Sequence, residues 1–126
     1  MTTFQKTPVP AHSPWGKIET ARQEAPGIWS VSTPSHGGFI ISDERLAAMP
    51  EVLRAAAGHA GAHCFEEDCE WALVVCSFPE EFDEHTLHQA RLTIRGTSQY
   101  DYPGFRKEVW TAAAAHVAEP ATCDAS

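Results

Sequence analysis

Residues 27–42 read GIWSVSTPSHGGFIIS, and this stretch decides the fold class. Its first part, IWSVST, alternates between two sets of side chains and is rich in β-branched and aromatic residues, which indicates a strand. PSHGG follows as turn chemistry, because its two glycines can adopt positive φ. FIIS then returns as a second strand. The stretch therefore predicts a β-hairpin formed by residues 27–33 and 39–42.

Short helices are predicted on the C-terminal side of the hairpin. Ser42 can cap a helix over residues 43–49, whose first turn carries two acidic residues, the charge that the helix dipole favours there. Pro50 suits the first turn of a second helix over residues 50–57. The small and glycine-rich residues 55–63 predict a flexible connection.

Two longer helices are predicted nearer the C-terminus. Asp83 can cap the first, over residues 83–96, and Gly96 suits its C-terminal cap. Pro103 opens the second, which runs over residues 103–119.

Residues 64–76, CFEEDCEWALVVC, are compatible with two kinds of element. The apolar run within residues 70–76 could be a buried strand, because the periodicity of a short apolar run does not distinguish a strand from a helix. As a helix, the segment would carry Glu66, Glu67 and Asp68 in its first turn, where the dipole favours them. It would also form one continuous apolar face, made of Phe65, Cys69, Ala72 and Cys76. The sequence favours the helix, and the strand remains the alternative interpretation.

The ends of the chain carry little periodicity. Residues 1–14 contain three prolines and are expected to form a flexible arm, followed by an irregular or short-strand lead-in that packs Trp15 against the core. Residues 120–126 are expected to be frayed. A chain of 126 residues, 43% hydrophobic and 21% charged, suits one globular domain. The expected fold is a single α+β domain over residues 1–126, with a β-hairpin or small antiparallel sheet covered by several short helices.

Composition also limits the cellular compartment. No apolar stretch approaches the roughly 20 residues that span a bilayer, and the N-terminus lacks the charged and apolar regions of a secretory signal. A cytoplasmic protein without a membrane partner is therefore expected. Its cysteines are then expected to be reduced thiols. They are Cys64, Cys69, Cys76 and Cys123.

The net charge of −8 is concentrated in one segment. Residues 55–90 contain eight acids and no lysine or arginine, whereas the two charges balance on either side. The eight acids are Glu66, Glu67, Asp68, Glu70, Glu80, Glu81, Asp83 and Glu84. Such a field repels nucleic acid, so direct DNA or RNA binding is not expected, and it attracts metal ions or a basic protein surface.

A run of like charges is by default a solvated face. Here, however, the carboxylates repel one another with no interspersed base to relieve them. Carboxylates also accept the same bidentate arginine contacts as phosphates. A docking surface for a protein groove rich in arginine and lysine is therefore the functional interpretation of these acids, and a merely solvated face stays open beside it.

The strings SPWG, GIWSVSTPSHGGFIIS, EEDCEWA and FPEEF, spread from Ser13 to Phe82, resemble a family of small uncharacterised domains of proteobacterial plasmids and phages. A weaker similarity extends into the final helix. The resemblance implies a mobile-element setting in a host bacterium, where accessory proteins often counter host defence. Residues 55–63 look longer than the corresponding join in similar sequences, which argues against a role for His59 and His63.

A thiol enzyme is one alternative. It would use Cys69 with His36 and the neighbouring carboxylates, yet those carboxylates disfavour the thiolate that a nucleophile needs. His36 is expected instead to order the hairpin turn through a backbone hydrogen bond.

A metal site is a second alternative. His59 and His63 are four residues apart and are followed by two cysteines, Cys64 and Cys69, which are ligand types that zinc accepts. A looser candidate pair is His85 and His88, beside acidic residues. Neither spacing matches an established zinc motif, so no metal or cofactor is expected.

The predicted function is a non-enzymatic counter-defence protein of the anti-CRISPR or antirestriction kind. It would dock through the acidic surface on a basic nucleic-acid-handling complex, such as a CRISPR effector or a restriction enzyme. The alternatives are a small metal- or thiol-dependent enzyme and an interaction domain in plasmid maintenance. Trp15, Tyr100 and Tyr102 are candidate aromatic anchors for an interface.

Overall fold

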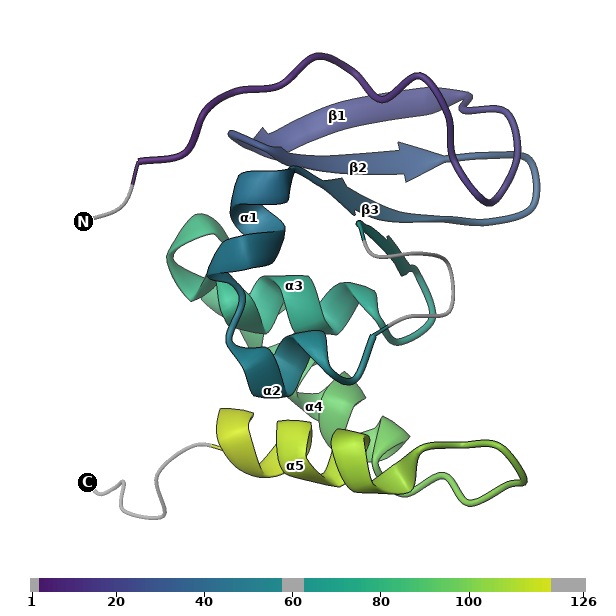
Figure 1. The fold of residues 1–126 in the computed structure, drawn as a ribbon, viewed down its shortest axis with the longest axis vertical. Helices are drawn as coiled ribbons and strands as arrows, with labels where there is room; N and C mark the ends of the chain where they lie inside the picture. The colour runs from purple at the N-terminus through teal and green to yellow at the C-terminus, as the bar shows by residue number, and fades with distance from the viewer. Residues whose placement is uncertain (1–2, 58–62, 119–126) are drawn as a thin grey trace.

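The computed structural model describes residues 3–57 and 63–118, which form an antiparallel sheet packed on a set of short helices (Figure 1). The strands are β1 Thr20–Ala25, β2 Ile28–Ser32, β3 Gly37–Ile41 and β4 Cys64–Glu66. The helices are α1 Asp43–Ala48, α2 Glu51–Arg54, α3 Trp71–Ser77, α4 Glu84–Thr97 and α5 Lys107–Val117, with a 3-10 turn η1 at Pro79–Glu81. The expected small α+β domain is therefore confirmed.

The sheet has the strand order β1-β2-β3-β4, and each neighbouring pair is antiparallel. β2 and β3 form the predicted hairpin, in which Trp29 pairs with Ile40. Thr33 closes the turn, because its backbone N–H donates to the His36 carbonyl at 2.7 Å and its hydroxyl oxygen accepts from the His36 N–H at 3.1 Å. The turn therefore uses the backbone of His36 and leaves its ring exposed.

The two edge strands are the elements that periodicity describes least. β1 is a six-residue strand with the sequence TARQEA, in which Thr20 is the only β-branched residue and no residue is aromatic. Its backbone pairing with β2 supplies the stability that its side chains do not. β4 has only three residues, and its central Phe65 pairs with Phe39 and is fully buried.

Gly38 lets β4 and Trp15 lie directly against β3. A Cβ atom at this position would lie 2.2 Å from the carbonyl oxygen of Phe65 and 2.8 Å from the Trp15 ring. Only a residue without a side chain allows this approach. Trp15 is half-buried there, packed against the sheet.

The predicted caps of α1 and α4 are confirmed. The Ser42 hydroxyl accepts from the N–H of Arg45 at 3.1 Å, and the Asp83 carboxylate accepts from the N–H of Thr86 at 2.7 Å. α2 is shorter than expected and follows Pro50, which occupies the cap position.

Two other predicted helix boundaries are wrong. α4 continues through Gly96 to Thr97, and Ser98 is its C-terminal cap, because nothing in the backbone at Gly96 departs from the helix. α5 begins at Lys107 instead of Pro103, since Pro103 and Gly104 form a turn, in which Gly104 has a φ of +89°, and residues 105–106 are not helical.

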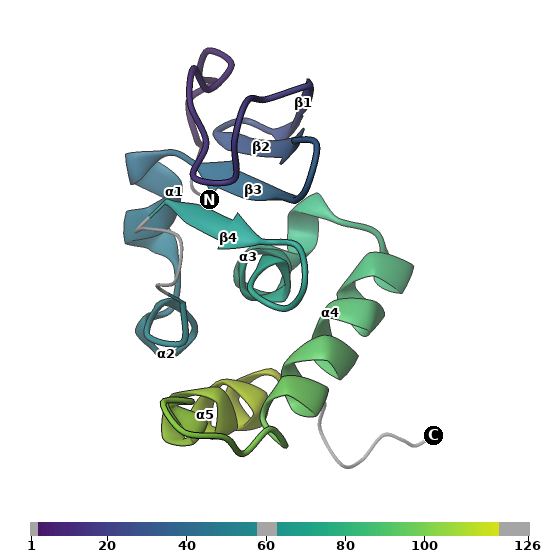
Figure 2. The same cartoon turned by 90° about the vertical axis from the view of Figure 1, so that its right-hand side faces the viewer.

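α3 lies at the centre of the domain, and the helical reading of residues 70–76 is confirmed. Figure 2 views α3 along its axis, beneath β4 and between α2 and α4. Its residues 72–75 are fully buried, so they form a helix that is apolar on all sides.

The predicted start of this helix is wrong. Glu66, Glu67 and Asp68 do not occupy its first turn, and Phe65 does not share a helical face with Cys69. Cys64–Glu66 form β4 of the sheet, where Phe65 is buried. Residues 67–70 form the turn before α3 begins.

Residues 3–14 form no helix or strand and pass along the sheet (Figure 1). The Trp29 indole N–H donates to the Thr7 hydroxyl at 3.0 Å, and the Phe4 ring packs edge-on against Phe78 with centroids 5.7 Å apart. These contacts attach the arm to the sheet and to the end of α3. The predicted frayed tail over residues 120–126 lies outside the described residues.

Candidate functional site

The eight predicted carboxylates fall into two groups at opposite ends of α3. The N-terminal acidic group consists of Glu66, Glu67, Asp68 and Glu70, which precede the helix. The C-terminal acidic group consists of Glu80, Glu81, Asp83 and Glu84, which follow it. Since α3 has seven residues and a helix rises about 1.5 Å per residue, the groups lie roughly 10 Å apart or more. The acidic run of the sequence thus becomes two separate surfaces.

Glu66 is folded back onto its own turn. Its carboxylate accepts the backbone N–H groups of Asp68, Cys69 and Glu70 at 2.8, 2.9 and 2.8 Å. Burial acts to raise the pKa of Glu66, but the hydrogen bonds outweigh burial and the pKa is lowered. This side chain therefore holds the turn that leads into α3.

Two further acids are engaged inside the protein. Glu70 is fully buried, and its carboxylate accepts the N–H of Glu66 at 3.4 Å. Glu81 pairs with Arg45 at 2.6 Å, and the Arg45 side chain is only 1% exposed. Both acids have structural partners, so neither is available as an open charge.

Arg45 sits in an aromatic enclosure that joins distant parts of the chain. Its guanidinium lies 3.7 Å from the ring centroid of Phe4 and 4.7 Å from that of Phe78. Its Nε donates to the carbonyl of Pro26 at 2.9 Å, whereas Nη1 is buried without a hydrogen-bond partner in the described residues. The arm, the β1–β2 turn, α1 and η1 therefore meet at one buried cation.

Five carboxylates remain exposed, two in the N-terminal group and three in the C-terminal group. They are Glu67, Asp68, Glu80, Asp83 and Glu84. Asp83 also caps α4, and the hydrogen bonds from Thr86 lower the pKa of its carboxyl. The Glu67 carboxylate lies 4.0 Å from Nδ1 of His36 across the hairpin turn.

The surroundings of Cys69 disfavour thiolate chemistry. Its Sγ donates to the Glu66 carboxylate at 3.3 Å. Burial and the negative charges of Glu66 and Glu70 raise the pKa of Cys69 to about 12. Burial likewise raises the pKa of Cys76 to about 11 and raises that of Cys64. The ring of His36 lies 4.0 Å from the carboxylate of Glu67.

The residues considered as alternative metal ligands do not assemble within the described part of the chain. In residues 3–57 and 63–118, no three His, Cys, Asp or Glu side chains are grouped so that they could hold a metal ion. His63 instead contacts Asp43 of α1 at 2.5 Å. His85 and His88 are exposed on α4, and His59 lies outside the described residues.

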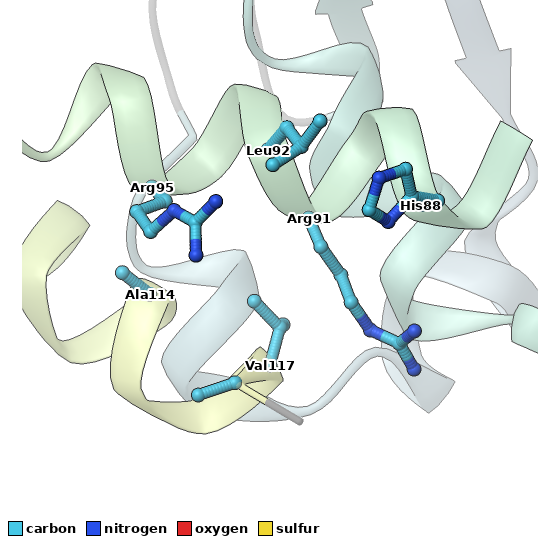
Figure 3. Close-up of a pocket in the computed structure, with 7 residues that line it drawn as sticks. His88, Arg91, Leu92, Arg95, Ala114 and Val117 are labelled. Atoms are coloured by element: carbon cyan, nitrogen blue, oxygen red, sulfur yellow. The ribbon is translucent and has the colours of Figure 1, made fainter. Parts of the chain in front are cut away.

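A hollow between α4 and α5 was missed by the sequence analysis (Figure 3). Its volume is about 240 Å³. Seven residues line it: His88, Arg91, Leu92, Arg95, Ala114, Val117 and Ala118. The spacing of His88, Arg91 and Arg95 by three and four residues places them on one face of a helix, so the basic side of the hollow can be read from the sequence. Its apolar side depends on how α5 packs.

The candidate aromatic anchors differ in exposure. Tyr100 and Tyr102 are 52% and 53% exposed, and they cluster with Phe105 at centroid distances of 5.0 to 6.4 Å. Trp15 is half-buried against Gly38. The two tyrosines belong to the connection between α4 and α5, away from α3 (Figure 1).

Among the described residues, no helix has the length and apolar character needed to cross a membrane. Comparison with curated proteins and with solved structures gave no significant match. A family model, by contrast, matches residues 8–125, which is most of the chain and includes both acidic groups and the α4–α5 hollow. The chain therefore belongs to the DUF7007 family, a domain of unknown function.

Proposed function

We propose that this protein is a non-enzymatic binding protein whose exposed carboxylates dock on a basic surface of a nucleic-acid-handling protein complex. The main support is that lysine and arginine side chains of the described residues do not pair with these carboxylates. The carboxylates concerned are Glu67, Asp68, Glu80, Asp83 and Glu84.

Electrostatics supports a binding role for such groups. Like charges held on neighbouring positions repel one another, and a partner's guanidinium groups would relieve that repulsion. Complementary charge also speeds the encounter of two proteins, most strongly at low salt. The protein stabilises its other three carboxylates internally, through Arg45 and through the turn before α3, which leaves these five as the docking set.

The mechanism follows from carboxylate chemistry. An arginine fork that holds a phosphate can hold a carboxylate with the same two hydrogen bonds. The two acidic groups, separated by α3, would occupy two arginine or lysine sites that otherwise hold nucleic acid. The resemblance to plasmid and phage domains makes a CRISPR effector complex or a restriction enzyme the first partner to test, and a counter-defence role the biological proposal.

The test variant neutralises only exposed carboxylates without a capping role: Glu67→Gln, Asp68→Asn, Glu80→Gln and Glu84→Gln. Substituting Glu66, Glu70 or Glu81 would disturb the fold and confuse the result. The control variant makes the same charge change elsewhere on the surface: Glu19→Gln, Glu51→Gln, Asp101→Asn and Glu108→Gln, all at exposed positions.

Binding of purified CRISPR effector and restriction complexes is measured by biolayer interferometry at two salt concentrations, with and without competing nucleic acid. The proposal expects one complex to bind wild type and control, to bind the test variant at least about ten-fold more weakly, and to be released by nucleic acid. Equal loss in both variants would show a general charge effect. That outcome, unchanged binding of the test variant, or no binding at all, would overturn the proposal.

A further inference from the structure

We propose that the hollow between α4 and α5 binds a small amphipathic anion, a carboxylate or phosphate that carries a short apolar chain. This proposal does not rest on the acidic docking surface, although Glu84 of that surface lines a neighbouring hollow together with His88 and Arg91. Two arginines of α4 lie in the wall of the proposed site.

The size of the hollow suits a small ligand. Its volume of about 240 Å³ lies just below the range of roughly 300–1,000 Å³ that is typical of drug-sized ligand sites. A second hollow of about 190 Å³ adjoins it and shares Arg91 and Val117. The second hollow is also lined by Cys76, Pro79 and Leu87, so it offers an apolar extension.

The charged wall is suited to an anion. His88, Arg91 and Arg95 all come from α4, and among the residues that the structure describes no carboxylate lines this hollow. In Figure 3 the two guanidinium groups lie on either side of Val117: that of Arg95 is close to Ala114 of α5, and that of Arg91 extends to the opposite side. Each guanidinium can donate two parallel hydrogen bonds to a carboxylate or phosphate.

The apolar wall explains why an inorganic ion alone would not fill the site. Leu92 on α4 faces solvent with 37% of its area exposed, and Ala114 and Val117 on α5 complete the surface. Burying such apolar area is favourable by about 25 cal/mol per Å². A chain of a few carbons attached to the anionic group would contact these side chains, which gives the preference for an amphipathic ligand.

The test is a methyl and amide NMR titration of the full chain with four probes. Hexanoate and hexyl phosphate carry both charge and chain, inorganic phosphate carries only charge, and hexanol carries only the chain. The proposal expects saturable shifts at Leu92 and Val117 with hexanoate or hexyl phosphate, and at least about ten-fold weaker binding of phosphate and hexanol. The stronger of the two amphipathic probes identifies the head group as carboxylate or phosphate.

The variants separate a built site from general charge. Arg91→Gln with Arg95→Gln should weaken the amphipathic probes at least about ten-fold, whereas Lys17→Gln with Arg22→Gln removes equal charge from an exposed region and should leave them unchanged. Leu92→Gln should weaken them while keeping the arginines. No saturable shift, equal binding of phosphate and hexyl phosphate, or equal loss in both double variants would overturn the proposal.

Discussion

The buried guanidinium of Arg45 makes a sharp prediction about stability, and Glu81→Gln is the perturbation that tests it. Arg45 is fully buried, and within the described part of the chain its charge is paired with the carboxylate of Glu81, at 2.6 Å. Breaking a buried ion pair by removing one partner costs about 3–5 kcal/mol. Because the Glu81 side chain is 27% exposed, water can partly replace the lost carboxylate, so we expect the lower end, about 3 kcal/mol.

Removing the cation itself should cost less. Arg45→Met keeps a long flexible side chain between the rings of Phe4 and Phe78, where sulfur and methylene groups pack well. It loses the hydrogen bond to the Pro26 carbonyl and the cation–π contact, about 1–2 kcal/mol in all. It leaves Glu81 able to face water. The double variant should therefore match Arg45→Met and be more stable than Glu81→Gln alone.

Urea unfolding at pH 7 measures the four free energies of the cycle, provided that the dependence on urea concentration keeps the same slope. Glu80→Gln is the matched control, because the same change one residue away is at an exposed position and should stay within about 0.5 kcal/mol of wild type. The reasoning would be refuted if Glu81→Gln cost less than Arg45→Met, or if the second substitution failed to rescue the first.

Three further predictions concern other positions. Glu66→Gln should lower the free energy of unfolding by about 1–2 kcal/mol at pH 7. Because folding lowers the pKa of Glu66 from 4.5, this loss of stability should shrink as the pH falls through the pKa of the folded protein. An equal loss in urea unfolding at pH 7 and pH 3 would contradict this prediction. With the pKa of Cys69 raised from 9.0 to about 12, iodoacetamide at pH 8 should alkylate it about 1,000-fold more slowly in the folded than in the unfolded protein, as followed by mass spectrometry; similar rates would rule this out. Gly38→Ala should destabilise the protein by about 3 kcal/mol, because the added methyl would contact the Phe65 carbonyl. Gly96→Ala, with open space around the added methyl, should stabilise α4 by about 0.5–1 kcal/mol. Thermal unfolding in which the Gly38 variant is not the less stable of the two would contradict this packing.

Local patterns account for the elements that were predicted well. The alternation in residues 27–33 predicts the first strand of the hairpin, because strand pleat is a property of neighbouring residues. The two glycines predicted for the turn lie instead in β3, where Gly37 pairs with Ser32 and Gly38 with Val31, so the turn is formed by residues 33–36. Ser42 and Asp83 cap their helices through hydrogen bonds only three residues long. The same kind of pattern was insufficient for β1 and β4, whose strand conformation depends on pairing with β2 and β3.

The candidate site divides in the same way. Composition and order along the chain are enough to locate all the excess negative charge in residues 66–84 and to show that no base lies among them. Which carboxylates reach solvent is decided only in three dimensions, because Glu81 meets its cation 36 residues away and Glu70 is covered by the core. The α4–α5 hollow likewise needs two helices to pack. Charge is carried by each residue, whereas burial and pairing are properties of contacts between residues distant in sequence, and tertiary structure alone creates those contacts.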